Sequence, residues 1–548
     1  GFNAEKVEYI YLKGSRNILF DQAMPELNLA MKEGQDIGSK HTRRASAGFF
    51  GRINYDYKDI YLLEINGRYD GSSRFPHNAH WAFFPSVSLG YRFTEEPYFK
   101  NLKNVVSNGK LRASMGEIGN EAIGDYMFEE LISQMEDKYV NWVDNNKPNA
   151  NLLTMYNMPD LVAKNLTWER IRTTDIGIDL GFLNNELMVG FDWYQRENRD
   201  MLAPSKVLPQ VLGADAPVSN AGTLRTRGWE FTVDWHHRFG EFNVYANFNL
   251  SDSRSKVVKW DNPSMLLNAN YSGKNYGDIW GFETERYFEE SDFTGKNPDG
   301  TWNYAKGVAS QKGLEQGSFH YGPGDVKFKD LDGNGVIDGG KGTADNHGDL
   351  KVIGNFLPRY EYSFHLGGSW KGVDLDLFFQ GVGKRDAWTI SSMNFPLMRK
   401  ADLALYAHQT SYNKVRFSAD YKTIKGYDID QSNKYPRLYP GNEGVGTISG
   451  IENGTNNYYP QSRYLTDMSY LRLKNVTLGY TLPTELTRKA YIQKARIYFS
   501  ASNLFLLYKG NDLPVDPEIN AGAGLKYGGW GRTAPITRTF SFGMQVTL

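Results

Sequence analysis

The residues of this chain with the clearest capacity for chemistry form one short run: Asp330, Asp332, Asn334, Val336 and Asp338. Side-chain oxygens recur at every second position, and the backbone carbonyl of Val336 adds another, which is the spacing of the first half of a calcium-binding loop. The glycines inside the run permit a sharp turn around an ion. The run therefore predicts a calcium site that orders the chain around it. No other cofactor is expected, and none is required.

The same run supports a second interpretation. Lys341 stands where a complete calcium loop has a bidentate glutamate, and flanking helices are not apparent. Asp345 or Asp349 would have to supply the late carboxylate. The alternative is a turn rich in Asp, Asn and Gly that is closed by its own side chains and holds no metal.

Catalytic patterns find little support elsewhere. The chain has no cysteine, which excludes thiolate catalysis, and its nine histidines include no H-E-x-x-H pattern. His236 and His237 are adjacent in an expected strand, so they point to opposite faces. The glycine-rich run 522–531 does not follow a strand and open a helix, as phosphate loops do. An enzyme is therefore not expected, and a net charge of −1 does not favour nucleic acid as a partner.

The elements that would position such a loop are strands with two different faces. Within residues 228–239, Trp229, Phe231, Val233 and Trp235 alternate with polar residues. Side chains on a strand point to opposite faces with a period of two, so this strand has one apolar and one polar face. Aromatic residues make up 14% of the chain, which suits strands and the aromatic girdles of membrane barrels.

The alternation recurs in about fourteen segments, and the connections between them are alternately short and long. The expected strands are 6–14, 45–57, 59–70, 82–93, 109–118, 168–182, 186–197, 220–238, 241–253, 358–371, 373–385, 467–482, 494–505 and 536–548. Tight turns are expected at residues 57–59, 184–185 and 371–372. No run of about 18 apolar residues exists, so membrane-spanning helices are excluded. The pattern predicts an all-β, antiparallel transmembrane β-barrel, with a soluble β-sandwich or propeller as the alternative.

Several short motifs follow one another along the chain: residues 68–75 (RYDGSSRF), 84–92 (FPSVSLGYR), 111–120 (LRASMGEIGN), 168–169 with 173–177, 220–222 with 228–230, 379–383 (FQGVG), 470–480 (YLRLKNVTLGY) and 502–505 (SNLF). In their sequence and their order they resemble the SusC/RagA family of TonB-dependent outer-membrane transporters. Each motif is weak alone, and together they are specific from about residue 45 to the end of the chain.

The resemblance implies a plugged barrel of about 22 strands, of which this chain would hold roughly the C-terminal 14. Residues 1–548 are then expected to be the C-terminal part of the barrel, with the signal peptide, TonB box and plug outside this chain. A closed barrel is expected because unpaired strand edges are not tolerated in lipid.

The resemblance also implies partners and a location. A SusD-like surface lipoprotein would cap the barrel as a lid, TonB would pull on the plug, and two such pairs would form a dimer in the lipid of a Gram-negative, Bacteroidetes-type outer membrane. The ligand would be a glycan or a peptide. The alternatives are a passive porin, a structural outer-membrane barrel, or an adhesin that uses its long loops.

The long connections are the expected place of lid contacts, since long loops on a rigid scaffold usually carry function. They cover residues 119–166, 198–219, 254–357, 386–466 and 506–535. Tryptophans that could stack on sugars are Trp81, Trp142, Trp260, Trp302, Trp388 and Trp530. Interface anchoring or loop packing would explain each of them equally well, so no substrate-binding residue is assigned.

Overall fold

The computed structural model contains one large antiparallel sheet of 14 strands, which we call the wall. It describes the whole chain except residues 33, 133, 141–152, 158, 160, 164–165, 205–216, 318, 390, 392, 398–403, 421–422, 439–455 and 520–535. The wall strands, in spatial order, are β1 (Phe2–Ser15), β2 (Asp36–Tyr57), β3 (Tyr61–Ser72), β4 (Trp81–Tyr91), β5 (Val106–Asn120), β8 (Glu169–Phe182), β9 (Leu187–Pro204), β10 (Val218–Phe239), β11 (Phe242–Trp260), β18 (Arg359–Trp370), β19 (Val373–Lys384), β24 (Tyr470–Thr481), β25 (Lys494–Lys509) and β26 (Thr539–Thr547).

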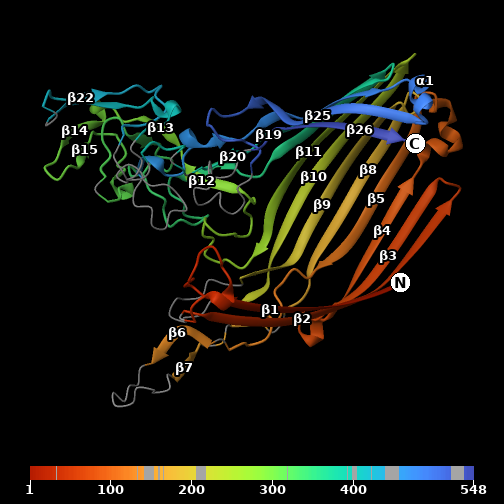
Figure 1. The fold of residues 1–548 in the computed structure, drawn as a ribbon. Coiled ribbons are helices and arrows are strands. Elements are labelled where there is room, and N and C mark those ends of the chain that lie inside the picture. The colour runs from red at the N-terminus through yellow and green to blue at the C-terminus, as the bar shows by residue number, and fades with distance from the viewer. Residues whose placement is uncertain are drawn as a thin grey trace.

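The wall is a curved sheet with two free edges. Neighbouring strands follow one another along the chain, and the sheet bends into a trough with β1 and β26 at its margins (Figure 1). Among the described residues, β1 bonds only to β2 and β26 only to β25. The predicted β architecture is confirmed, and all fourteen expected wall strands are present.

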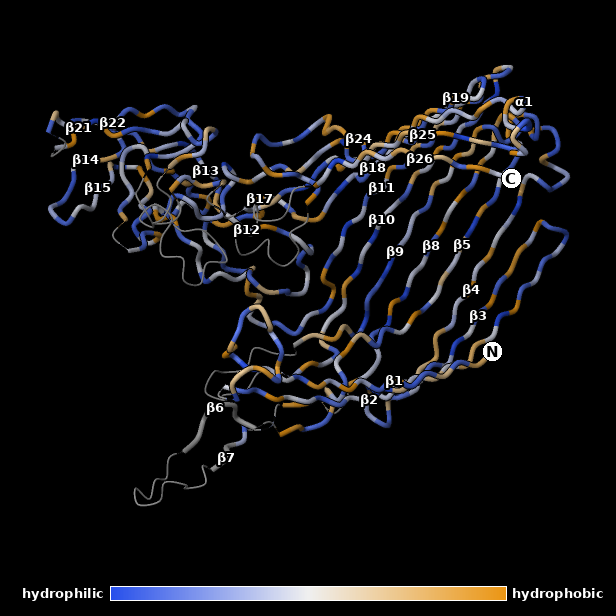
Figure 2. The backbone as a smooth tube through the Cα atoms, in the orientation of Figure 1, coloured by the Kyte–Doolittle hydropathy of each residue, from blue (hydrophilic) through white to orange (hydrophobic). Residues whose placement is uncertain are grey.

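The register aligns residues of like polarity across the wall. One row of paired residues on the outer, convex face contains Leu63, Leu89, Ala113, Ile176, Trp193 and Trp229. The next row, on the inner face, contains Gly90, Arg112, Gly177, Asp192 and Glu230. Figure 2 shows the resulting alternation of hydropathy along the strands. The wall therefore separates an apolar surface from a polar one, as a barrel in a membrane requires.

The short links gather at one end of the wall, where α1 (Thr484–Thr487) and the C-terminus also lie (Figure 1). The turn between β18 and β19 has positive φ at both Lys371 (49°) and Gly372 (88°), which is the conformation of a tight hairpin. A Cβ on Gly372 would lie 2.6 Å from the Thr481 carbonyl oxygen, so glycine is required there. No helix among the described residues combines the length and apolar character needed to cross a membrane.

The alternation of link lengths holds with two irregularities, of which one is the connection from β24 to β25 that carries α1 and the turn Arg488–Ala490. The connection from β4 to β5 carries two 3₁₀ turns, Phe93–Glu95 and Pro97–Leu102, at the end where the other links are short. The connection from β3 to β4, at the opposite end, is brief because Phe75 and the turn His77–Ala79 fold it back against the wall. Several strands also run further than expected, β2, β9 and β11 above all.

The two longest connections are folded, whereas the sequence presented them only as loops. Together they form a compact lobe beyond the ends of β11, β18, β19 and β24, which we call the cap (Figure 1). Its small sheets pair β12 (Asp278–Phe282) with β17 (Leu350–Asn355), β13 (Thr284–Tyr287) with β16 (Val326–Phe328), β14 (Phe293–Lys296) with β15 (Trp302–Tyr304), β20 (Asp386–Ala387) with β23 (Thr466–Asp467), and β21 (Lys414–Phe417) with β22 (Ile424–Asp428). A further hairpin, β6 (Gln134–Val140) and β7 (Leu153–Tyr156), projects from another connection.

Candidate functional site

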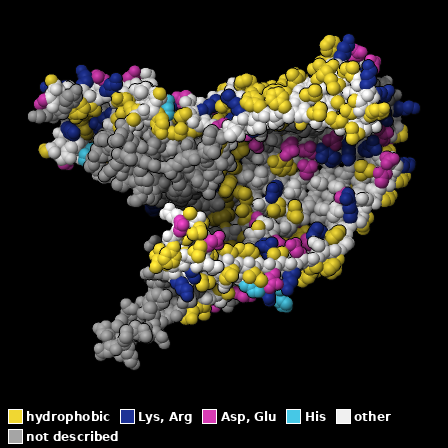
Figure 3. Space-filling model, in the orientation of Figure 1, with side chains coloured by type: hydrophobic (Ala, Val, Ile, Leu, Met, Phe, Trp, Pro, Cys, Tyr) yellow, Lys and Arg dark blue, Asp and Glu magenta, His cyan; other side chains and the backbone are white. Residues whose placement is uncertain are grey.

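The inner face of the wall is lined by ion pairs that join neighbouring strands. Arg112 of β5 contacts Asp179 of β8 at 2.8 Å and reaches Asp192 of β9 at 3.0 Å. Figure 3 shows such acidic and basic side chains gathered in the hollow of the trough. A surface of this kind suits water and polar solutes, because an unpaired charge would be costly against lipid.

Glycines allow these contacts to cross a whole strand. Gly177 lies between Arg112 and Asp192 in the paired row, and a Cβ there would lie 2.1 Å from the Asp192 carboxylate and 2.8 Å from the Arg112 guanidinium. The ion pair can therefore pass directly over the backbone of β8 only because residue 177 has no side chain.

The same arrangement recurs on the opposite flank of the trough. Gly479 of β24 lies between Asp374 of β19 and Arg496 of β25, which form an ion pair at 2.5 Å. A Cβ on Gly479 would lie 2.5 Å from both partners. Each of these two ion pairs joins two strands that are separated by a third strand. They add to the backbone hydrogen bonds that join each strand to its neighbour.

The inner face also contains a cavity of about 410 Å³ towards the end with the short links. Its lining is mixed, with Lys110, Asp179, Thr232 and Asp234 among the polar members. Its position on the inner face makes it accessible to a polar solute and not to lipid.

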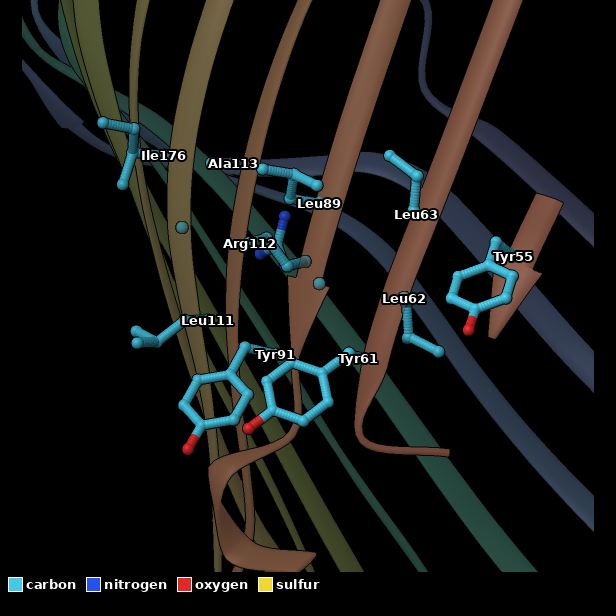
Figure 4. A pocket seen from close by; sticks show the side chains of 12 residues that line it. Tyr55, Tyr61, Leu62, Leu63, Leu89, Tyr91, Leu111, Arg112, Ala113 and Ile176 are labelled. Carbon is cyan, nitrogen blue, oxygen red and sulfur yellow. The ribbon is translucent and has the colours of Figure 1, made fainter. Parts of the chain in front are cut away.

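The outer face carries a different depression, an apolar groove of about 450 Å³. Figure 4 shows Tyr61 and Tyr91 side by side at one end, with Leu89 and Ala113 beyond them. The two rings stack at 5.2 Å, and the Tyr61 hydroxyl donates a hydrogen bond to Glu96 at 2.6 Å. Tyrosines with an apolar body and a bonded hydroxyl are typical of the aromatic girdle at a membrane interface.

The cap has its own hydrophobic core, to which both long connections contribute. Its fully buried aromatic side chains include Tyr287, Tyr321, Phe328, Phe395 and Tyr435. Phe395 of the second connection stacks on Tyr458 at 4.4 Å, whereas Phe282 of the first connection stacks on Phe328 at 4.9 Å. The cap is consequently a packed unit and not a set of independent loops.

A buried ion pair locks the two connections of the cap together. Asp325 has no exposed surface, and its carboxylate contacts the Arg437 guanidinium at 2.6 Å. The Asn457 amide and the Gly322 backbone N–H also donate to it, both at 2.9 Å. A buried charge is stable only when it is paired and fully hydrogen-bonded, so this contact holds one chain arrangement.

Burial also sets the protonation of the cap's core hydroxyls. It raises the pKa of Tyr321, Tyr458 and Tyr464 well above that of a free tyrosine. These groups are therefore neutral over the physiological range, and the Tyr321 hydroxyl donates to the Asn456 carbonyl at 2.8 Å. They serve packing and hydrogen bonding and not proton transfer.

The predicted calcium run lies on the surface of the cap. Carboxylate oxygens of Asp330, Asp332 and Asp349 all lie within 4.8 Å of one another, so the structure brings a late aspartate to two of the predicted ligands. Asp338 is not a member of this carboxylate group, and its side chain accepts from the Gly340 backbone N–H at 2.7 Å. The Asn334 side-chain oxygen accepts from the Val336 backbone N–H, also at 2.7 Å.

The backbone already satisfies much of this acidic group. Asp330 accepts hydrogen bonds from the N–H groups of Gly333 and Gly335 at 2.7 and 2.9 Å. The buried Asp349 accepts from Leu331 at 2.6 Å and from Asp338 at 2.9 Å. The three carboxylates fit a hard cation in type and proximity, while the hydrogen bonds are those of a closed turn, so calcium binding stays a prediction.

Asp345, the other candidate for the last carboxylate of the calcium loop, lies outside the acidic group. The Thr343 hydroxyl donates to Asp345 at 2.6 Å, which lowers the pKa of that carboxyl. Asp345 is not a member of the three-carboxylate group.

Most of the tryptophans that could have stacked on sugars pack against other residues of the protein. Trp81 stacks on Tyr69 at 5.1 Å on the outer face, and Trp302 and Trp388 pack against the cap core. Trp260, at the end of β11, covers the backbone of Gly222, whose Cβ would lie 2.5 Å from the ring. Trp142 and Trp530 lie outside the described residues.

Comparisons with known proteins agree on one family. Residues 7–504 match the family described as TonB dependent receptor-like, beta-barrel. TonB-dependent receptor P3 of Formosa agariphila is 29% identical over 528 residues, which is 91% of this chain and 45% of that protein. TonB-dependent receptor SusC of Bacteroides thetaiotaomicron is 26% identical, over 88% of this chain and 42% of its own length. This chain thus spans less than half of the length of these two relatives.

A solved structure shares the fold. The RagAB peptide transporter superposes with a TM-score of 0.70 at 21% sequence identity, covering 100% of this chain and 52% of that chain. The wall and its order of strands are therefore an arrangement already seen in a transporter of this architecture.

The glycine crossings of the wall yield a mutational test. Gly177→Ala and Gly479→Ala should each displace the ion pair above them and destabilise the wall by about 1–3 kcal/mol, as overpacking does. Gly51→Ala on β2 is the matched control, since a Cβ there meets nothing within 4 Å. Urea unfolding in detergent measures the effect, and equal midpoints for all three variants would contradict the account.

The acidic group of the cap is tested with calcium. Millimolar Ca²⁺ should slow hydrogen exchange of residues 330–349, and the double variant D330N/D332N should abolish that protection. Asp299→Asn is the control, because Asp299 closes another turn of the cap through Thr301 and lies outside the three-carboxylate group. Unchanged exchange of the wild-type protein at millimolar Ca²⁺ would remove the metal interpretation.

Proposed function

This chain belongs to the TonB dependent receptor-like β-barrel family, and from that membership we propose that it forms the barrel wall of an importer for oligosaccharides or peptides. The family consists of outer-membrane receptors and transporters and not of enzymes. The observation that carries the proposal is the two-faced wall, apolar outside and lined by ion pairs inside. A solute that crosses the membrane along this wall meets many polar and charged side chains, with a few apolar ones such as Met188 among them.

The free edges of the wall support a larger barrel. In lipid every backbone N–H and C=O must be bonded within the protein, so β1 and β26 need further strands beside them. We propose that strands outside this chain complete a barrel of about 22 strands, a size that leaves room for a plug. The plug and the TonB-binding segment would then also lie outside residues 1–548.

The cap supports a partner at the mouth of the barrel. It is a packed lobe beyond the wall, and its β21–β22 hairpin exposes a cross-strand pair of apolar residues, Phe417 (49% exposed) and Ile424 (41%). We propose that a SusD-like lipoprotein binds there as a lid, and that two such pairs associate in a Bacteroidetes-type outer membrane. Support comes from the relative named SusC and from the fold shared with the RagAB peptide transporter.

Purification from native membranes tests both the partner and the transport. The complex should contain a surface lipoprotein, and uptake of a labelled oligosaccharide or peptide pool should require TonB. The variant F417D/I424D should lose the lipoprotein. The control L486D/Y491D, at the opposite end of the wall, should retain it, since it also places two aspartates at exposed apolar positions.

Two results would contradict the proposal. Uptake that continues without TonB would indicate a passive porin. A complex that lacks any lipoprotein and takes up neither class of solute would indicate a structural barrel or an adhesin.

A further inference from the structure

A concentration of basic side chains lies on the outer face of strands β8 to β11, immediately beyond a row of paired tryptophans. Trp193 and Trp229 face each other in that row. Two residues further along β10, about 7 Å away, Arg227 pairs with Gln195 on one side and Arg254 on the other. Because side chains alternate, Arg227 projects from the same face as Trp229, which is the lipid-facing one.

The next row of paired residues on this face is also mainly basic. Arg172, Glu197, Arg225 and Lys256 are paired across β8, β9, β10 and β11. We call the basic members of this region the basic belt: Arg170, Arg172, Arg199, Arg225, Arg227, Arg254 and Lys256. It stretches over four adjacent strands, β8 to β11, in three successive rows.

Two glutamates neutralise only part of the basic belt. Glu117 is shared by Arg172 at 2.8 Å and Arg170 at 3.3 Å. Glu197 is shared in the same way by Arg225 and Arg199, both at 2.6 Å. Seven basic side chains thus face two carboxylates. The neighbouring Asp252 adds nothing to the balance, because both Nε and an Nη of Arg359 donate to it.

The remaining three cations have no carboxylate partner among the described residues. Arg227 donates to the Gln195 amide oxygen at 2.8 Å, and no acidic contact is found for Arg254 or Lys256; all three are exposed. Moreover, Arg227 lies directly opposite Arg254, and Arg225 lies directly opposite Lys256. Like charges at directly opposed positions destabilise a sheet, so this face is incomplete without an anion.

We propose that the basic belt binds the phosphate groups of lipids in the outer leaflet. The belt begins where the apolar band ends, which is the level of lipid headgroups, and it is on the side of the wall that faces lipid. Guanidinium groups bind phosphate through paired hydrogen bonds, and each basic residue near a charged membrane surface adds attraction. The inference rests on the placement of the wall in the outer membrane and is independent of what is transported.

Lipid retention measured by native mass spectrometry tests this site. The protein is reconstituted with phosphorylated lipid A or with its dephosphorylated form in a phosphatidylcholine background. The wild type should retain the phosphorylated form preferentially. The variant R227Q/R254Q/K256Q should bind it about a hundredfold more weakly. The charge-conserving variant R227K/R254K should keep most of the binding, which shows that the wall still folds.

A matched control removes basic residues from the other end of the wall. The variant R238Q/K371Q/K489Q should bind phosphorylated lipid like the wild type, since these three residues lie at the short links. Inorganic phosphate at millimolar concentration should not displace the lipid.

Four outcomes would overturn the proposal. They are unchanged binding by R227Q/R254Q/K256Q, equal retention of the dephosphorylated lipid, displacement by inorganic phosphate, and a protein bound over the belt in place of lipid. None of them bears on TonB-dependent uptake, so failure here is distinguishable from failure of the proposed transport.

Discussion

The constraint on which this structure depends is the backbone hydrogen-bond ladder. In the hydrocarbon core of a membrane no water competes for N–H and C=O groups, so each strand must bond to a neighbour along its whole length. Long antiparallel strands with tight links at one end follow directly from that requirement. It also explains why the margins of the wall matter: within the described part of the chain, β1 and β26 each bond to a neighbour on one side only.

Side-chain alternation then assigns a different solvent to each face. The outer face can be apolar throughout because the backbone is already satisfied. The inner face uses its polarity for contacts that skip a strand, such as Arg112 with Asp192 over Gly177. Beyond the aromatic row the outer face becomes polar again, and there Arg227 and Arg254 oppose each other. A single strand such as β10 thus contributes side chains to three environments: the apolar outer face, the polar inner face and the basic region beyond Trp229.

The wall could be predicted from the sequence because its information is local and periodic. All fourteen strands were expected, and the turn at Lys371 and Gly372 has the backbone conformation predicted for it. The ends of β9 and β11 were placed too early, since the regular alternation of apolar and polar residues is lost in 198–204 and 254–260. The 3₁₀ turns after β4 were missed because Pro97 and its neighbours carry no strand period.

The cap could not be predicted for the opposite reason. Its strands are short, and its stability comes from contacts between residues far apart in the chain, such as Asp325 with Arg437. Composition gave no signal either, because the aromatic content of both connections is close to the 14% of the whole chain. The acidic run was recognised from its spacing, yet its grouping with Asp349 depends on how the chain returns through the cap. Such long-range closure is not encoded in any local pattern.

The central claim is that one face of the wall meets lipid and the other meets water. Because the chain contains no cysteine, single cysteines can be placed at positions 231, 232, 233 and 234 of β10 and spin-labelled in reconstituted bilayers. Labels replacing Phe231 and Val233 should be relaxed by dissolved oxygen, which concentrates in lipid. Labels replacing Thr232 and Asp234 should be relaxed by a water-soluble nickel complex. Equal access of the nickel complex to all four positions would contradict the account.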